Sequence, residues 1–197
     1  MAKKVCCWTL LPLLCLALGV GCGEMGKVDQ GRVISFDPAK QAATFIRDVK
    51  GDPNKPDYSQ LPPVTYTLPQ DPQETGPLPK AGKRMNLDTQ KRVITIFDTA
   101  SQGFKQIPYT LIDQQDNVPK DSPLVAGKQF PTIDRDKKTI TIYSGRQKIL
   151  TTFSLPDEYF SLPDDTWDSG DEVRVYYKEP GKALRFMNIS KTDIFKK

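Results

Sequence analysis

The chain has 197 residues, of which 38% are hydrophobic and 26% charged. Its formal net charge is +4, and +2 without Lys3 and Lys4. A charge so close to neutral argues against a general nucleic-acid binder. It contains no histidine and no cysteine after Cys22, which excludes Ser-His-Asp and Cys-His nucleophiles, histidine-based zinc sites and, in the body of the chain, iron–sulfur clusters. We therefore predict a protein that is not an enzyme and that has no catalytic, cofactor-binding or metal-binding residues.

Residues 1–21 have the pattern of an export signal. Lys3 and Lys4 precede an apolar run that reaches Val20, and small residues then lead to Cys22. This ending is similar to the lipobox of bacterial lipoproteins, in which a cysteine is lipidated and becomes the mature N-terminus. The pattern predicts a signal peptide over residues 1–21 and a lipid on Cys22. The alternatives are an ordinary signal peptide and an uncleaved anchor, although the apolar run is short for a spanning helix.

Residues 22–26 are predicted to be the lipid-anchored N-terminus and a short tether, because strand-like alternation begins at Val28. The four residues 23–26 span at most about 14 Å when fully extended. A lipid on Cys22 would therefore hold the folded domain close to the bilayer. We expect the protein in the bacterial cell envelope, facing the periplasm, with the outer membrane favoured over the inner one. A partner would be another envelope component within reach of that membrane.

Residues 27–197 are predicted to be an all-β domain built from antiparallel hairpin repeats, over approximately residues 27–81, 82–126, 127–169 and 170–190. A glycine followed by a lysine or an aspartate marks the start of each copy, with Gly26 directly before the first, and strands rich in β-branched residues follow. No segment shows a convincing helical period of apolar residues. We expect one or two small barrel-like or sandwich domains. Asp residues that precede polar turns open the predicted hairpins, namely Asp37, Asp88, Asp98 and Asp134.

Apolar residues alternate with polar ones along the predicted strands, as in half-buried antiparallel strands. The residues on the apolar face are expected to form the core. They are Ile94, Ile96, Ile140, Ile142, Val173 and Val175.

The loop of residues 156–169 combines aromatic and acidic side chains, which is typical of protein interfaces. Its candidate partner-binding residues are Tyr159, Asp164, Asp165, Trp167 and Asp168. In one alternative, Trp167 folds inward with Phe160 as a lid on the core. In another, the acidic stretch of residues 164–172 binds a cation such as Ca²⁺ through its carboxylates, although its spacing does not match an EF-hand. A solvated acidic loop is the simplest interpretation of that stretch.

Three segments besides the predicted lipidation signal resemble a family of uncharacterised lipoproteins from sulfate-reducing bacteria. They are residues 61–69 (LPPVTYTLP), 143–148 (YSGRQK) and 162–167 (LPDDTW). The resemblance covers nearly the whole chain. It implies an envelope location and a domain of unknown function, and it implies no activity.

The leading functional hypothesis is a non-catalytic, lipid-anchored envelope protein that serves as a binding or structural module for another envelope component. One alternative is a carboxylate-dependent hydrolase of an envelope polymer. The other is an oligonucleotide-binding type of barrel, which Gly31 to Phe36 loosely suggests. Such barrels stack bases on aromatic side chains of adjacent strands, whereas Ala42 and Ala43 occupy the next strand here. We therefore expect no nucleic-acid partner.

Overall fold

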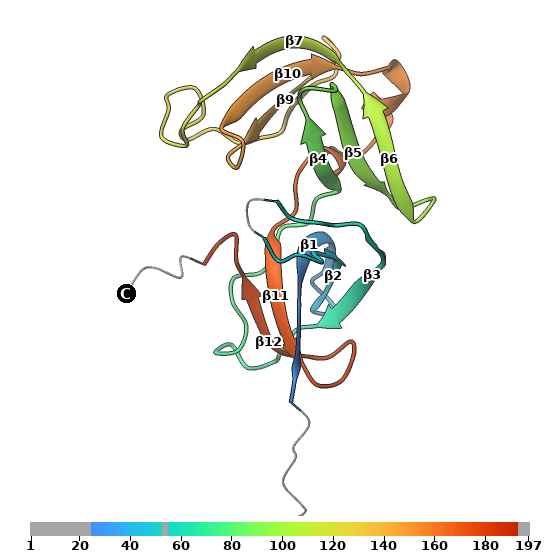
Figure 1. The fold of residues 1–197 in the computed structure, drawn as a ribbon, viewed down its shortest axis with the longest axis vertical. Coiled ribbons are helices and arrows are strands. Elements are labelled where there is room, and N and C mark those ends of the chain that lie inside the picture. Colours follow the sequence, from blue (N-terminus) through green and yellow to red (C-terminus); the bar gives the residue numbers. More distant parts are fainter. Residues whose placement is uncertain (1–24, 53–54, 193–197) are drawn as a thin grey trace, which may run out of the picture.

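The computed structural model describes residues 25–52 and 55–192 and shows an antiparallel β protein with two short 3-10 helices. The predicted signal peptide and Cys22 lie outside the described residues. Within that part of the chain, no helix is long and apolar enough to cross a membrane. The strands form two lobes, and the described part of the chain begins, in blue, at the free end of the first lobe (Figure 1).

The first lobe is one five-stranded sheet with the order β12-β11-β1-β2-β3. Its strands come from both ends of the described chain and are β1 (Lys27–Asp37), β2 (Ala42–Arg47), β3 (Gln60–Thr67), β11 (Glu172–Tyr177) and β12 (Ala183–Asn188). The sheet curls around a core that includes Val33, Phe45, Tyr66, Val175 and Phe186. Because β1 pairs with both β2 and β11, the two ends of the chain share one sheet.

The second lobe comprises residues 82–169 and contains two sheets. One has the order β4-β5-β6, and the other has the order β7-β10-β9-β8. Their strands are β4 (Arg84–Asp88), β5 (Val93–Asp98), β6 (Gly103–Pro108), β7 (Thr110–Gln115), β8 (Thr132–Asp134), β9 (Thr139–Ser144) and β10 (Ile149–Ser154). Both sheets contribute to one core, which also receives Phe160 from the helix η1 (Asp157–Ser161) and Trp167, the residue directly after the helix η2 (Asp164–Thr166). This lobe is a small sandwich.

The predicted all-β class and the predicted core are confirmed. The six residues assigned to the apolar face are between 0% and 3% exposed. None of the three sheets closes on itself in the described residues, so the architecture is a sandwich rather than a barrel.

The predicted Asp turns are also present and share one geometry. The side chain of Asp37 accepts the backbone N–H of Ala39 at 3.0 Å, and Asp98 accepts that of Ala100 at 3.1 Å. The last residue of each turn has a positive φ, 48° at Gln41 and 52° at Gln102. The aspartate thus satisfies backbone donors inside the turn, and the following left-handed residue returns the chain to the sheet.

The two lobes are joined by two chain crossings, residues 80–84 and residues 168–172, which pair with each other and with β1. The backbone N–H of Gly82 donates to the carbonyl of Val33 at 3.1 Å, and Val33 donates to Asp171 at 3.0 Å. Both Gly82 and Gly170 lie where a Cβ atom would overlap a neighbouring backbone carbonyl. Only glycine lets the crossings approach this closely. A small apolar cluster with members from both lobes covers the junction; it consists of Ile34, Ile46, Tyr58, Met85 and Phe97.

Candidate functional site

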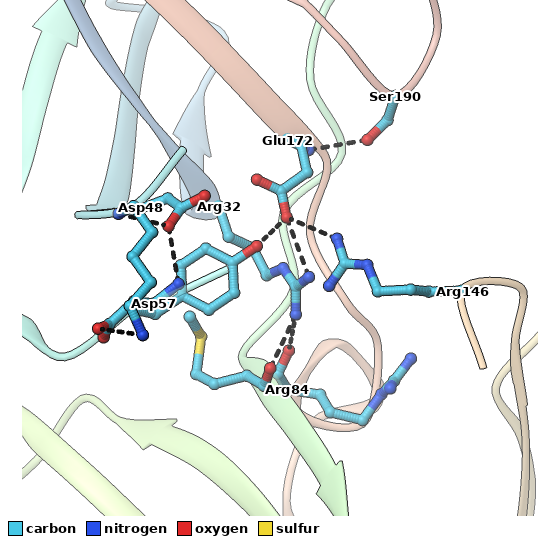
Figure 2. Close-up of polar contacts among 10 residues, drawn as sticks. Arg32, Asp48, Asp57, Arg84, Arg146, Glu172 and Ser190 are labelled. Carbon is cyan, nitrogen blue, oxygen red and sulfur yellow. Dashed lines mark hydrogen bonds and ion pairs between the residues drawn. The ribbon is translucent and has the colours of Figure 1, made fainter. Parts of the chain in front are cut away.

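A cleft of about 710 Å³ lies beside the junction of the two lobes. Segments that are distant in the sequence line it together. The first lobe provides Arg32, residues 55–59 and Glu172, and the second provides residues 84–87 and 143–147. Figure 2 shows the polar side chains of both lobes meeting here.

Arg32 of β1 connects the two lobes. Its Nη1 donates to the carbonyl of Met85 at 2.9 Å and to that of Arg84 at 3.3 Å, and its Nη2 donates to Glu172 Oε1 at 3.0 Å. The ring centroid of Tyr58 lies 4.5 Å from the guanidinium carbon, within cation–π range. The Arg32 side chain is 8% exposed. These contacts fix its position, so Arg32 is part of the wall of the cleft.

Glu172, at the start of β11, is the acceptor at the centre of this wall. Its Oε1 accepts hydrogen bonds from Arg32 and from the hydroxyl of Tyr58, and Arg146 Nη2 lies 3.5 Å from the same oxygen. Burial raises the pKa of the Tyr58 phenol, which therefore stays a neutral donor at physiological pH. The backbone N–H of Glu172 donates to Ser190 Oγ at 2.8 Å. Three donors thus hold one carboxylate oxygen.

Arg84, the first residue of β4, differs from Arg32 because it has no carboxylate partner among the described residues. It is 8% exposed, and its Nε donates to the carbonyl of Trp167 at 2.9 Å. Its two terminal nitrogens have no acceptor in the described part of the chain. Burial lowers the pKa of Arg84 to about 10, and repulsion by Arg32 and Arg146 adds to this, with partial opposition from Asp168. At neutral pH the guanidinium is still charged.

The lining of the cleft carries an excess of positive charge. Its cations are Arg32, Lys55, Arg84 and Arg146, and its carboxylates are Asp57 and Glu172. Asp57 accepts the N–H of Ser59 and lies 3.5 Å from Lys50 outside the lining. Both carboxylates are thus engaged by donors, an arrangement that suits binding better than proton transfer.

Comparison with known families identifies the family of the chain. A family model described as a domain of unknown function (DUF4881) matches residues 24–197. The chain belongs to this family. The match covers both lobes and the cleft between them, and the part of the predicted resemblance that concerns a domain of unknown function is confirmed. No curated protein and no solved structure matches the chain.

The structure places Trp167 in the core of the second lobe. It is 1% exposed, and Phe160 of the same loop is 9% exposed. The helices η1 and η2 turn the loop inward over the sandwich, so the aromatic rings pack against its apolar residues. This position agrees with the alternative of a lid on the core, and the role of Trp167 as a partner contact stays a prediction.

The other predicted contact residues are nearer to solvent, and none of them lines the cleft. Each of the three aspartates has a cationic neighbour: Asp164 pairs with Arg135 at 2.6 Å, Asp165 with Lys83 at 3.3 Å, and Asp168 with Lys80. Tyr159 is half-buried, and Lys105 Nζ lies 4.9 Å from its ring centroid. In the described ranges, no three acidic side chains gather as a metal site would require.

Proposed function

We propose that the protein is a non-catalytic binding module of the bacterial cell envelope, anchored by a lipid on Cys22, and that the cleft between its lobes is the binding site for another envelope component. In this proposal the family consists of envelope lipoproteins like those of sulfate-reducing bacteria, facing the periplasm. The observation that carries it is the cleft of about 710 Å³, which has a polar lining held in place by contacts between the lobes.

The preformed shape of the cleft supports binding. Arg32 ties β1 to the backbone of β4, and the paired crossings at Gly82 and Gly170 leave little room for the lobes to shift. When a site is already ordered, ligand binding costs less conformational entropy, so more of the contact energy appears as affinity. Catalysis by carboxylates has less support. Glu172 Oε1 is held by three donors, and Asp57, the other carboxylate of the lining, also has donor partners.

Replacement of Cys22 by alanine is expected to convert the protein from a membrane-bound to a soluble form. The sequence before Cys22 has the small residues that lipoprotein processing needs, and the acyl chains would provide the membrane affinity. Phase partitioning in detergent and intact mass measurement check this. A wild-type protein of unmodified mass in the aqueous phase would refute the anchor.

Replacement of Gly145 by tryptophan is expected to block the cleft. Gly145 lies in the turn between β9 and β10, its only neighbour within 4 Å of a Cβ atom is the ring of Tyr143, and it lines the cleft. Recovery of the crosslinked envelope partner should fall at least about tenfold, which corresponds to about 1.4 kcal/mol of binding free energy. The matched control is Thr99→Trp, at the equivalent place in the turn between β5 and β6, which lies outside the cleft. Equal recovery with both variants would refute the cleft as the site.

A further inference from the structure

We infer that the ligand of the cleft carries an oxyanion, a carboxylate, phosphate or sulfate group, which Arg84 and Arg146 bind. This inference rests on the proposed function, because it names the chemistry of what the cleft binds.

Arg84 is the first observation behind it. A buried guanidinium costs free energy unless an anion and hydrogen-bond acceptors compensate for its lost hydration. Arg84 is 8% exposed, and its only acceptor in the described chain is the carbonyl of Trp167. The nearby carboxylate of Asp168 forms its ion pair with Lys80 instead. Arg84 is one of the residues that line the cleft, and its terminal N–H groups have no acceptor in the described part of the chain.

Arg146 is the second observation. It lies in the turn between β9 and β10, and its side chain is 37% exposed. Among the described residues, its one hydrogen bond or ion pair is the 3.5 Å approach to Glu172 Oε1. That oxygen already accepts closer hydrogen bonds from Arg32 and Tyr58. Most of the guanidinium donors of Arg146 therefore remain available. In Figure 2, the side chain of Arg84 extends away from the Arg32–Glu172 contacts and toward the side from which Arg146 comes.

The two guanidinium groups repel each other, and this repulsion adds to the effect of burial in lowering the pKa of Arg84. An oxyanion that contacts both groups would replace this repulsion with two charge-assisted attractions. Guanidinium forks match the planar or tetrahedral arrangement of oxygens in such groups and bind them through paired hydrogen bonds. A neutral ligand would leave both cations without compensation. Lys55 adds a further positive charge to the lining.

The test is calorimetric titration of the full-length protein in detergent with inorganic phosphate, sulfate and succinate at constant ionic strength, with chloride as the reference. At least one of the three should bind saturably. Arg84→Met should weaken that binding at least tenfold. Because the Arg84 variant removes a contact to Trp167, Arg146→Met serves as a second variant. The Arg146 side chain is 37% exposed, so its replacement should disturb the fold less, and it should also weaken binding. Arg185→Met is the control, because Arg185 pairs with Glu74 on the first lobe outside the cleft.

The result of the titration distinguishes the kinds of envelope component that could carry the oxyanion. Preference for phosphate or sulfate indicates a phosphorylated or sulfated envelope component, and preference for succinate indicates an acidic peptide or an acidic sugar. Absence of saturable binding, or binding that neither cleft variant weakens, overturns the inference. If no oxyanion binds while Gly145→Trp still abolishes partner recovery, the oxyanion inference fails and the proposed binding function stands. If Gly145→Trp also leaves recovery unchanged, both fail.

Discussion

Replacement of Gly170 by alanine should lower the free energy of unfolding by about 3 kcal/mol or more, the upper part of the range for overpacked sites. Gly170 lies in the second crossing between the lobes, and a Cβ atom on it would overlap the carbonyl oxygen of Val33. Backbone atoms cannot move aside as a flexible side chain can. The crossing must therefore separate from β1, which breaks the hydrogen bond from Val33 to Asp171. Loss of this hydrogen bond should also widen the cleft, which Gly170 lines.

Urea titration followed by circular dichroism measures this effect. The control is Gly103→Ala, because Gly103 opens β6 and a Cβ atom there would lie 3.6 Å from the nearest side chain, an ordinary contact. The control should change stability by less than about 1 kcal/mol, because glycine in a strand is not itself favourable. Equal midpoints for both variants would contradict the close approach at the crossing.

Replacement of Trp167 by alanine should cost about 3 to 5 kcal/mol of unfolding free energy, the range for truncating a buried large aromatic residue. Trp167 is 1% exposed and packs against apolar residues of both sheets of the second lobe. Its carbonyl also accepts the hydrogen bond from Arg84 Nε. The cavity would therefore loosen the sandwich and the segment that orients Arg84.

The measurement again uses circular dichroism in urea, because Trp167 is the one tryptophan after Cys22 and its removal abolishes the fluorescence signal. Tyr159→Ala is the matched control, since Tyr159 belongs to the same loop and is only half-buried. Its cost should be clearly smaller. A Trp167 variant as stable as the wild type, with reduced recovery of a crosslinked partner, would show that the ring serves as a contact after all.

The parts of the fold that could be predicted from the sequence depend on local chemistry. An aspartate side chain satisfies nearby backbone donors, so turns such as the one at Asp98 are visible in a stretch of five residues. Alternation along a strand assigns Ile94 and Ile142 to the core for a similar reason, because successive side chains point to opposite faces.

The arrangement of the lobes depends on contacts between distant segments. The predicted repeats follow the chain in order, whereas the first sheet takes β11 and β12 from the end of the chain and pairs β11 with β1. No local pattern specifies which of several similar strands will be neighbours, because each of them presents one apolar face.

The cleft could not be predicted for the same reason. Arg32 lies 52 positions from Arg84 and 140 positions from Glu172, so their proximity appears only in the folded chain. One signal was present in the sequence: Arg32 is a charged residue directly before the apolar run of residues 33–34 in a predicted strand. The burial of Trp167 could not be predicted for a different reason. A tryptophan in a polar, Pro-bounded loop has the same local pattern whether its ring faces solvent or the core.

Photocrosslinking in living cells tests the central claim, that the cleft is the binding site, most directly. A photoreactive amino acid is placed at Ser144 in the cleft lining or, as a control, at Ser101 in an exposed turn outside it. The proposal predicts one discrete adduct with an envelope component from Ser144 and none from Ser101. No adduct from Ser144, together with an adduct from the same amino acid placed at Glu158 in the loop of residues 156–169, would contradict it and place the binding surface on that loop.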